Sequence, residues 1–244
     1  MIDLKNITKE YNDQLVIDNV SVSFNEAETT VILGPSGAGK STLLRAINLL
    51  ELPDSGEMEL DEYNVNFDNE ISDNQKLMIR KKSAMVFQNW NLFPHLTVLQ
   101  NIVEGPIQVL HVNAQEANER AMELLKKVGL TQEFSKYPYE LSGGQQQRVS
   151  ICRVLAMDPK YILFDEPTSA LDPEFGAQIL RFINQLAEQS KSQIIITHNI
   201  EFARKTADKI IFLEGGKIHY NGPADEFFNK PSKRVEKFLK AMEF

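Results

Sequence analysis

The sequence is poor in cysteine and in long apolar runs, and each shortage excludes a class of protein. A single cysteine, Cys152, rules out an intramolecular disulfide and fits a reducing compartment. No window holds about 18 uninterrupted apolar residues and no signal-like segment opens the sequence, so we expect a cytosolic chain that does not itself span a membrane. Cys152 lies in the apolar stripe of an expected helix, where a small core residue is the better interpretation than a nucleophile.

Positive charge is scarce as well. Lysine and arginine number 26 against 34 aspartates and glutamates, which gives a net charge of −8 and a pI near 5.2. Nothing in this balance favours a nucleic-acid backbone as a partner. The only basic cluster, Arg80-Lys81-Lys82, is short, and we expect a solvated surface turn there. With 244 residues, 42% of them hydrophobic, the chain can bury a sizeable core in one or two domains.

Short apolar runs bounded by turn residues recur along the chain, with helical patterns between them. This alternation predicts an α/β fold with a mostly parallel sheet whose strands are buried on both faces. The runs are "TVILG" (Thr30–Gly34), "AMVFQ" (Ala84–Gln88), "YILFD" (Tyr161–Asp165) and "QIIIT" (Gln193–Thr197).

Two other segments follow an antiparallel pattern. Within the first 26 residues, apolar side chains fall on even positions, which predicts half-buried antiparallel strands. Near the other end, "KIIFLEGGKIHY" (Lys209–Tyr220) predicts a hairpin that turns at Gly215-Gly216. The alternating apolar residues near the N-terminus are Val16, Val20, Val22 and Phe24.

The middle of the chain, residues 89–157, is mainly helical in pattern and includes "AQEANERAMELLKKVGL" (Ala114–Leu130). No buried strand interrupts it. We therefore expect a helical subdomain at 89–157, inserted into an α/β core that is formed by 1–88 and 158–244 and also carries the antiparallel β subdomain. Together these parts are expected to form one functional domain.

"GPSGAGKST" matches the phosphate-loop pattern G-x-x-x-x-G-K-[ST] and lies between an expected strand and an expected helix. Its glycines let the backbone wrap, so that N–H groups and the helix N-terminus point at phosphate oxygens. Lys40 is expected to reach the β- and γ-phosphates, and Ser41 to place its hydroxyl on Mg²⁺. A plain glycine-rich strand-to-helix turn is the alternative, but a chance match is rare in a chain of this length. The expected nucleotide-binding residues are Gly34, Pro35, Ser36, Gly37, Ala38, Gly39, Lys40, Ser41 and Thr42. The following helix is expected to bury one face, made of Leu43, Leu44, Ile47 and Leu50.

"YILFDEP" follows more than a hundred residues later and looks like the second half of a nucleotide site. A buried strand ends in Asp165, which is placed to hold Mg²⁺ through its water shell. Glu166 comes next and is the expected general base for an attacking water. The alternative is that the two carboxylates cap a turn before Pro167. The phosphate loop already present in the chain favours the nucleotide site.

"LSGGQ" (Leu141–Gln145) places two glycines where a helix begins. Ser142 and Gln145 have the spacing of a capping box, so the helix is expected to start at Ser142. Gly143 and Gly144 then fall in its first turn, whose N–H groups lack intrahelical partners and can face an anion. A capped surface helix is the alternative. One nucleotide cannot easily use two such helix ends in one subunit, but two subunits related by a twofold axis can exchange them.

Taken together and in this order, "GPSGAGKST", "LSGGQ", "ILFDEP", "SALD" and "THN" resemble the ATP-binding subunit of an ABC transporter over essentially the whole chain. The resemblance implies an α/β P-loop NTPase (RecA-like) core with an N-terminal antiparallel β subdomain and an inserted α-helical subdomain. It implies two subunits that sandwich two ATP molecules head to tail. Each ATP then lies between the phosphate loop of one subunit and Ser142, Gly143, Gly144 and Gln145 of the other.

The same resemblance assigns roles to four further residues. Gln88 matches the Q-loop glutamine, a contact to Mg²⁺ and water that also senses the membrane partner. Tyr11 matches the aromatic residue that stacks on adenine, although by itself it reads equally well as a stray surface tyrosine. Asp172 in "SALD" matches the loop that touches the opposing subunit. His198 matches the switch histidine at the γ-phosphate; a lone histidine there is otherwise more often a satisfied strand-end residue.

A finer resemblance lies around the Q-loop. "VFQNWNLFPHLTVLQNI" and the stretch from "LSGGQ" to "ALDPE" look most like importers of polar amino acids. Three positions depart from the usual pattern. Trp90 lies in the surface that by resemblance receives the permease, Asn199 follows the switch histidine where an acidic residue is usual, and Ala27 occupies a turn where glycine is usual. An alanine at position 27 costs about 1 kcal/mol of stability if that turn needs φ > 0.

The sequence therefore predicts an ATPase that binds ATP and Mg²⁺ and couples hydrolysis to import of polar amino acids across the cytoplasmic membrane. The expected partners are transmembrane permease subunits, a substrate-binding protein indirectly and a second copy of the chain, with no nucleic acid. The expected location is the cytoplasmic face of the membrane, as a peripheral subunit. The alternatives are an exporter or lipid-handling ATPase, an importer for another small solute, a soluble nucleic-acid or ribosome ATPase, and a non-catalytic nucleotide-binding module.

Overall fold

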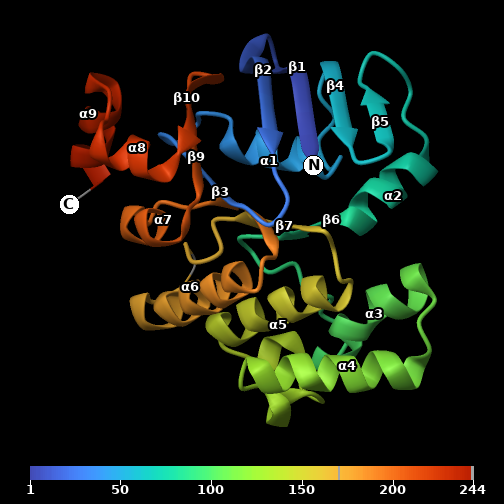
Figure 1. Ribbon diagram of the computed structural model, residues 1–244. Coiled ribbons are helices and arrows are strands. Elements are labelled where there is room, and N and C mark those ends of the chain that lie inside the picture. Colours follow the sequence, from blue (N-terminus) through green and yellow to red (C-terminus); the bar gives the residue numbers. More distant parts are fainter. Residues whose placement is uncertain (170, 243–244) are drawn as a thin grey trace.

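The computed structural model describes residues 1–169 and 171–242, which form two sheets with helices packed around them (Figure 1). Among these residues the larger sheet has six strands in the order β10-β9-β3-β8-β7-β6. Pairing is parallel from β9 to β6, and β10 pairs antiparallel with β9, so the mostly parallel sheet is confirmed. The strands are β3 (Thr29–Leu33), β6 (Ser83–Val86), β7 (Tyr161–Asp165), β8 (Ser192–Ile196), β9 (Lys209–Glu214) and β10 (Lys217–Pro223).

The smaller sheet is antiparallel and contains the N-terminus, as the alternating pattern predicts. Its order is β2-β1-β4-β5, and Figure 1 shows it beside α1, across the molecule from α3, α4 and α5. The strands are β1 (Ile2–Tyr11), β2 (Gln14–Phe24), β4 (Ser55–Leu60) and β5 (Tyr63–Asn66).

One end of β2 departs from the predicted alternation. Val20 is buried as expected, but Val16 is half-buried, and Ile17 is buried in its place. Asn19 adopts a left-handed φ of +53°, and the pairing with β1 shifts register between Val20 and Ile17. Because such a bulge inserts an extra residue into the strand, the side chains on its two sides are out of phase, so Ile17 and not Val16 shares the buried face with Val20.

The helices between residues 89 and 157 form a group of their own. The stretch 89–157 contains α3, α4, α5 and the two 3₁₀ turns η1 and η2, with no strand in it, and the three helices pack on one another (Figure 1). Within the part of the chain that the structure describes, no helix is long and apolar enough to cross a membrane. The helical bounds are α1 (Lys40–Ile47), α2 (Asp73–Lys82), α3 (Val98–Leu110), α4 (Ala114–Lys127), η1 (Thr131–Glu133), η2 (Pro138–Glu140), α5 (Gly143–Ala156), α6 (Pro173–Glu188), α7 (Ile200–Thr206), α8 (Ala224–Asn229) and α9 (Lys233–Met242).

The end of α1 corrects one prediction. The helix ends at Ile47, before the next expected turn, and Leu50 is 43% exposed. Leu49 is buried instead, and it adopts a left-handed φ of +53°. The helical period no longer applies beyond the end of the helix, so the expected face is correct only for the residues inside it.

The basic cluster is not a surface turn but the last turn of α2. Arg80 donates from Nη2 to the carbonyl oxygen of Leu49 at 2.7 Å. Lys82 forms ion pairs with Asp61 at 2.8 Å and with Glu62 at 2.7 Å. Basic residues are favourable at this end of a helix because they face the negative end of its dipole.

Two turn predictions are confirmed. The hairpin of β9 and β10 turns at Gly215 and Gly216, and both adopt positive φ. Ala27 has a φ of +53°, so the left-handed strain expected of a non-glycine residue is present there. Its N–H donates to the Ser192 hydroxyl at 2.9 Å, which helps to hold the turn.

Apolar residues fill both faces of the larger sheet and make two cores. One core joins the sheet to α3, α4 and α5, and the other joins it to α1 and the smaller sheet. Cys152 is fully buried in the first, and burial raises the pKa of its thiol to about 12. It is therefore the inert core residue that its position in the helix predicts.

The order of the central strands brings distant sequence segments together. β3 pairs with β8 and β8 pairs with β7, all in parallel, so their carboxyl ends lie side by side. Gly34 follows β3, Glu166 follows β7, and Thr197 and His198 follow β8. Ligands of open α/β sheets bind at this edge.

Candidate functional site

A hollow of about 440 Å³ lies around the phosphate loop, at the carboxyl edge of the larger sheet. It is large enough for a small-molecule ligand. Most of the predicted nucleotide-binding residues line it. The residues around it are Tyr11, Gln14, Val16, Ser36, Gly37, Ala38, Gly39, Lys40, Ser41, Thr42 and Glu166.

The start of α1 is built to leave its backbone donors open. Gly39 is the N-cap, has a φ of +94° and makes no side-chain capping bond. A Cβ on Gly39 would lie 2.6 Å from the Val16 carbonyl oxygen, so only glycine fits there. With no side chain capping them, the first N–H groups of α1 are available to an anion in the hollow.

Lys40 is the first residue of α1 and is only 6% exposed. Its Nζ donates to the carbonyl oxygens of Gly34 and Pro35, each at 2.9 Å. Burial lowers the pKa of Lys40, and the nearby Glu166 and Asp165 oppose this effect. The ammonium group is thus held at the loop by weak carbonyl partners, which phosphate oxygens can replace with stronger ones.

Asp165 ends β7 and is only 3% exposed. The Ser41 hydroxyl donates to its Oδ1 at 2.8 Å, and Arg45 Nη2 lies 3.3 Å from its Oδ2. Ser41 and Arg45 are four residues apart on α1 and therefore share one helix face. The sequence motifs do not include Arg45; its spacing of four residues from Ser41 is the signal in the sequence that points to it.

Glu166 and His198, predicted separately, form one unit. Glu166 Oε1 lies 2.9 Å from His198 Nε2. Glu166 has a left-handed φ of +46°, and its N–H donates to the Ile196 carbonyl oxygen at 3.1 Å. Such strain in a non-glycine residue is costly and is typical of functional sites. The carboxylate is thereby aimed into the hollow, with the imidazole beside it.

Tyr11 stands at the rim of the hollow and is 40% exposed. Lys9 Nζ lies 5.1 Å from the centre of its ring. Partial burial and the neighbouring Glu51 raise the pKa of the phenol. The ring is therefore neutral at physiological pH, and it is placed to stack on a flat heterocycle held at the loop.

Two other predicted residues lie outside this hollow. Gln88 follows β6 by two residues and is exposed in a turn, so it does not end the strand as its position in "AMVFQ" suggests. Asp172 is exposed and is the N-cap of α6, without a side-chain capping bond. Ala170, the second residue of "SALD", lies outside the described residues.

The predicted capping box of α5 is confirmed. Ser142 Oγ accepts from the N–H of Gln145 at 3.3 Å, and Gln145 Oε1 accepts from the N–H of Ser142 at 2.9 Å. Gly143 and Gly144 occupy the first turn. None of Ser142–Gln145 lines the hollow at the phosphate loop, so this chain folds the two helix ends into separate places.

Asn199 has a local structural role. It is the N-cap of α7, and its Oδ1 accepts from the N–H of Phe202 at 2.7 Å. Asparagine is among the best N-cap residues, so Asn199 is well suited to start the helix that follows His198.

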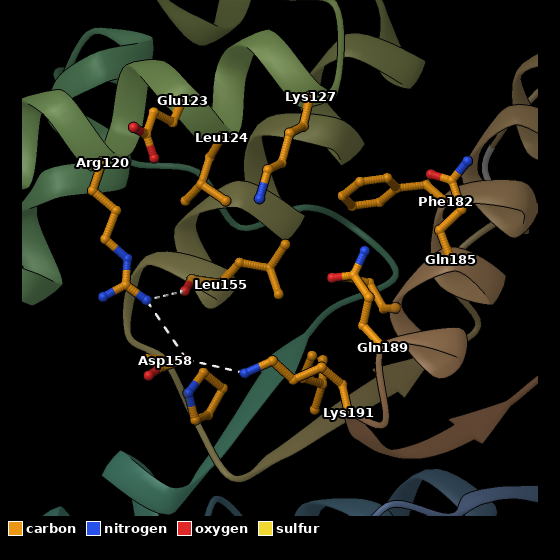
Figure 2. A pocket seen from close by; sticks show the side chains of 13 residues that line it. Arg120, Glu123, Leu124, Lys127, Leu155, Asp158, Phe182, Gln185, Gln189 and Lys191 are labelled. Carbon is orange, nitrogen blue, oxygen red and sulfur yellow. Dashed lines mark hydrogen bonds and ion pairs between the residues drawn. The ribbon is translucent and has the colours of Figure 1, made fainter.

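A second hollow of about 400 Å³ lies between α4, the end of α5 and α6, and Figure 2 shows the side chains around it. Asp158 Oδ1 lies 3.1 Å from Lys191 Nζ and 3.7 Å from Arg120 Nη2. Two of its cations, Arg120 and Lys191, therefore share a carboxylate partner within the protein. None of the predicted nucleotide residues is found here, so the phosphate-loop hollow is the candidate site.

The family model for ABC transporters matches residues 17–169. The chain is 43% identical to the L-cystine import ATP-binding protein of Bacillus subtilis, over 98% of this chain and 97% of that protein. It is 48% identical to a glutamine transport ATP-binding protein of Geobacillus stearothermophilus, over 98% of both. A dimeric ATP-binding cassette solved in a post-hydrolysis state with ADP and Pi superimposes with a TM-score of 0.82 at 36% identity, covering 92% of this chain and 99% of that one.

The two relatives match nearly the whole chain, and the matches agree with the geometry of the site. The chain belongs to the ABC transporter family. Within that family it is an ATP-binding subunit that hydrolyses ATP, with the P-loop NTPase fold that its motifs predict.

Proposed function

We propose that this subunit drives the import of polar amino acids through a membrane permease. The names of its relatives support this cargo, since they are import or transport proteins for cystine and glutamine. The observation that carries the mechanism is the Glu166–His198 pair, 2.9 Å apart beside the buried Lys40. Glu166 polarises the water that attacks the γ-phosphorus of ATP in line, and the proton of that water moves toward its carboxylate. The bond between the γ-phosphorus and the β,γ-bridging oxygen breaks in the same displacement, so the products are ADP and phosphate.

Charge that develops on the transferred phosphoryl group is stabilised by several donors. Lys40 exchanges its carbonyl partners for phosphate oxygens, and the N–H groups at the start of α1 point at the same anion. His198 reaches the γ-phosphate from its position beside Glu166. Tyr11 stacks on the adenine ring. Placing these groups in advance lets the site stabilise the transition state without reorganising.

Mg²⁺ fits the oxygen donors of the same site. Ser41 supplies a hydroxyl and Asp165 a carboxylate, their oxygens are 2.8 Å apart, and Gln88 supplies an amide oxygen from the neighbouring turn. Mg²⁺ prefers such oxygen ligands and usually takes only one or two carboxylates in addition to substrate phosphates. When bound, it neutralises charge on the β- and γ-phosphates.

The remaining donors come from a second copy of the chain. Gly143 and Gly144 begin a capped helix that does not line the phosphate-loop hollow of its own subunit. In a head-to-tail pair they face the ATP of the partner, and Asp172 lies at the contact between subunits. The dimeric cassette with 36% identity supports this assembly. Residues 89–157 act as a helical subdomain inserted into the core of 1–88 and 158–244.

The subunit works at the cytoplasmic face of the membrane as a peripheral component. Permease subunits contact it near Gln88, and a substrate-binding protein delivers the amino acid to the permease. ATP-driven closure of the subunit pair is the mechanical step, and hydrolysis reopens it.

Uptake of radiolabelled polar amino acids by cells depleted of this chain tests the proposal. Loss of uptake of one amino-acid group, restored by the native chain and not by Glu166→Gln, is the expected result. Unchanged uptake across the panel, with redundant importers removed, would contradict amino-acid import. The cargo would then be another solute, or the direction export, driven by the same ATPase.

A further inference from the structure

The indole of the half-buried Trp90 packs against the first turn of α5, although the two segments are more than fifty residues apart. A Cβ on Gly143 would lie 3.0 Å from Trp90 Cζ2 and 3.3 Å from Cη2. The far edge of the indole ring therefore fills the space that a side chain at 143 would take. Leu171 closes the same space from the other side, with a methyl carbon 3.6 Å from that position.

Trp90 is held in this position at a cost. Its φ is +59° and that of the next residue, Asn91, is +47°; left-handed backbone is rare for a bulky aromatic residue. Arg153, from α5 itself, donates to the Asn91 carbonyl oxygen at 2.6 Å and to that of Trp90 at 3.1 Å. Burial lowers the pKa of Arg153 to about 10, so it stays charged at physiological pH. Strain that is held by a charged partner is typical of a functional position.

The contact depends on the shape of the ring. Among the described residues, the buried Nε1 of Trp90 has no hydrogen-bond partner. A buried donor without an acceptor is unfavourable, so hydrogen bonding does not explain the choice of tryptophan. What tryptophan adds over a smaller aromatic is reach, because Cζ2 and Cη2 are the atoms nearest Gly143.

We propose that Trp90 is a positioning residue that locks the first turn of α5 to the segment following Gln88. Any displacement of that segment is then transmitted through the indole ring to Gly143. The inference deepens the proposed function, because it assumes that this first turn contacts the ATP of a partner subunit. It predicts that Trp90 acts on assembly of the ATP-bound pair and not on nucleotide binding by one subunit.

A double-mutant cycle tests the lock. Trp90→Ala, Gly143→Ala and the double variant are made in a Glu166→Gln background, and ATP-dependent dimerisation is measured by analytical ultracentrifugation. We expect Trp90→Ala to weaken the dimer by about tenfold, or ~1.4 kcal/mol, and the monomer to bind a fluorescent ATP analogue as before. Because Trp90→Ala frees the space for a Cβ at 143, the double variant is expected to dimerise better than the two single effects combined predict.

Three comparisons separate the outcomes. Trp90→Phe, which shortens the ring, is expected to lie between native and Trp90→Ala, whereas Phe134→Ala, which removes an exposed aromatic side chain elsewhere, is expected to leave dimerisation unchanged. Additive effects in the cycle, or loss of nucleotide binding by the Trp90→Ala monomer, would contradict the proposal that Trp90 positions the first turn of α5. If the Glu166→Gln parent itself forms no ATP-dependent dimer, the proposed function fails first, and the thermal unfolding midpoints of the four proteins still report whether positions 90 and 143 are coupled.

Discussion

The two helix ends that the motifs single out use opposite ways of starting a helix. α1 begins at Gly39 with no side-chain cap, and α5 begins at Ser142 with a complete capping box. At α1 the open donors face a hollow that Glu166 also lines. At α5 the box takes the N–H groups of Ser142 and Gln145 and leaves those of the two glycines.

The difference fits the proposal that one site is divided between two copies of the chain. The first helix end has a lysine, a carboxylate and an aromatic ring around it, so we expect it to bind a nucleotide by itself. The second has only backbone donors and a side-chain cap, so we expect it to contact a nucleotide that the other copy already holds. Variants of the first are therefore expected to affect binding or chemistry in a single subunit, and variants of the second to affect only the pair.

The largest effect is expected from Glu166→Gln. Removing the general base should lower ATP hydrolysis by about 10²- to 10⁴-fold and leave ATP binding intact, so the ATP-bound dimer accumulates. Phosphate release and gel filtration with ATP measure the two effects. Glu201→Gln, which alters an exposed carboxylate paired with Lys205, is the matched control. Hydrolysis near the native rate would contradict the role of Glu166.

The second-largest effect is expected from Lys40→Ala. It removes the charged donor of the first helix end, and we expect nucleotide affinity of the monomer to fall by about a hundredfold. Titration with a fluorescent ATP analogue measures it. Lys191→Ala removes a lysine at the second hollow and is expected to bind normally. Undiminished binding by Lys40→Ala would show that the loop does not hold the phosphates.

Ser142→Ala distinguishes the two helix ends most directly. It removes the capping box of α5 and should cost about 1 kcal/mol of stability. Ser72→Ala is a matched control, because Ser72 and Gln75 form the same box at the start of α2. Both variants are expected to unfold at lower denaturant concentration, but only Ser142→Ala should weaken the ATP-dependent dimer. Equal dimerisation by the two variants would mean that the second helix end is merely a capped surface helix.

The smallest effect is a difference in pH dependence. Burial lowers the pKa of Lys40 below its ordinary value of 10.5, against the opposing effect of Glu166 and Asp165. Lys40 is charged below its pKa, so ATP affinity of the monomer should be retained at neutral pH and lost as the pH rises, before an ordinary lysine titrates. Binding titrations of the folded monomer at rising pH measure this. Affinity that persists up to pH 10.5 would contradict it. The glycine N–H groups of α5 do not titrate. They should therefore add no further pH-dependent change to dimerisation measured at saturating ATP.

Much of the fold and site could be predicted from the sequence because the signals are local. The strand before the phosphate loop, the capping box of Ser142 and Gln145, and the hairpin at Gly215-Gly216 each depend on a few adjacent residues. The predicted face of α1 failed at Leu50, where the helix had already ended. The alternation of β2 failed at Val16, because a bulge at Asn19 changes its phase. The period of a helix or strand therefore predicts which side chains are buried only within the uninterrupted helix or strand.

The two glycines of "LSGGQ" show the same limit. Because Ser142 is the N-cap, the two glycines must lie in the first turn of the helix, and their backbone N–H groups are therefore available as donors. Their packing does not follow, since Trp90 covers Gly143 and Phe175 covers Gly144, where a Cβ would lie 3.1 Å from Phe175. Neighbours from two other segments therefore leave little room for a side chain at either glycine.

The α/β class, the phosphate loop, the order of the motifs and the starts of α1 and α5 follow from local sequence, because backbone conformation and capping depend on near neighbours. Which side chains meet depends on the tertiary structure. The order β3-β8-β7 brings His198 against Glu166 and Ser41 against Asp165, and the chain path brings Trp90 beneath Gly143. Such contacts join segments far apart in the chain, and the position of each depends on the packing of the whole core.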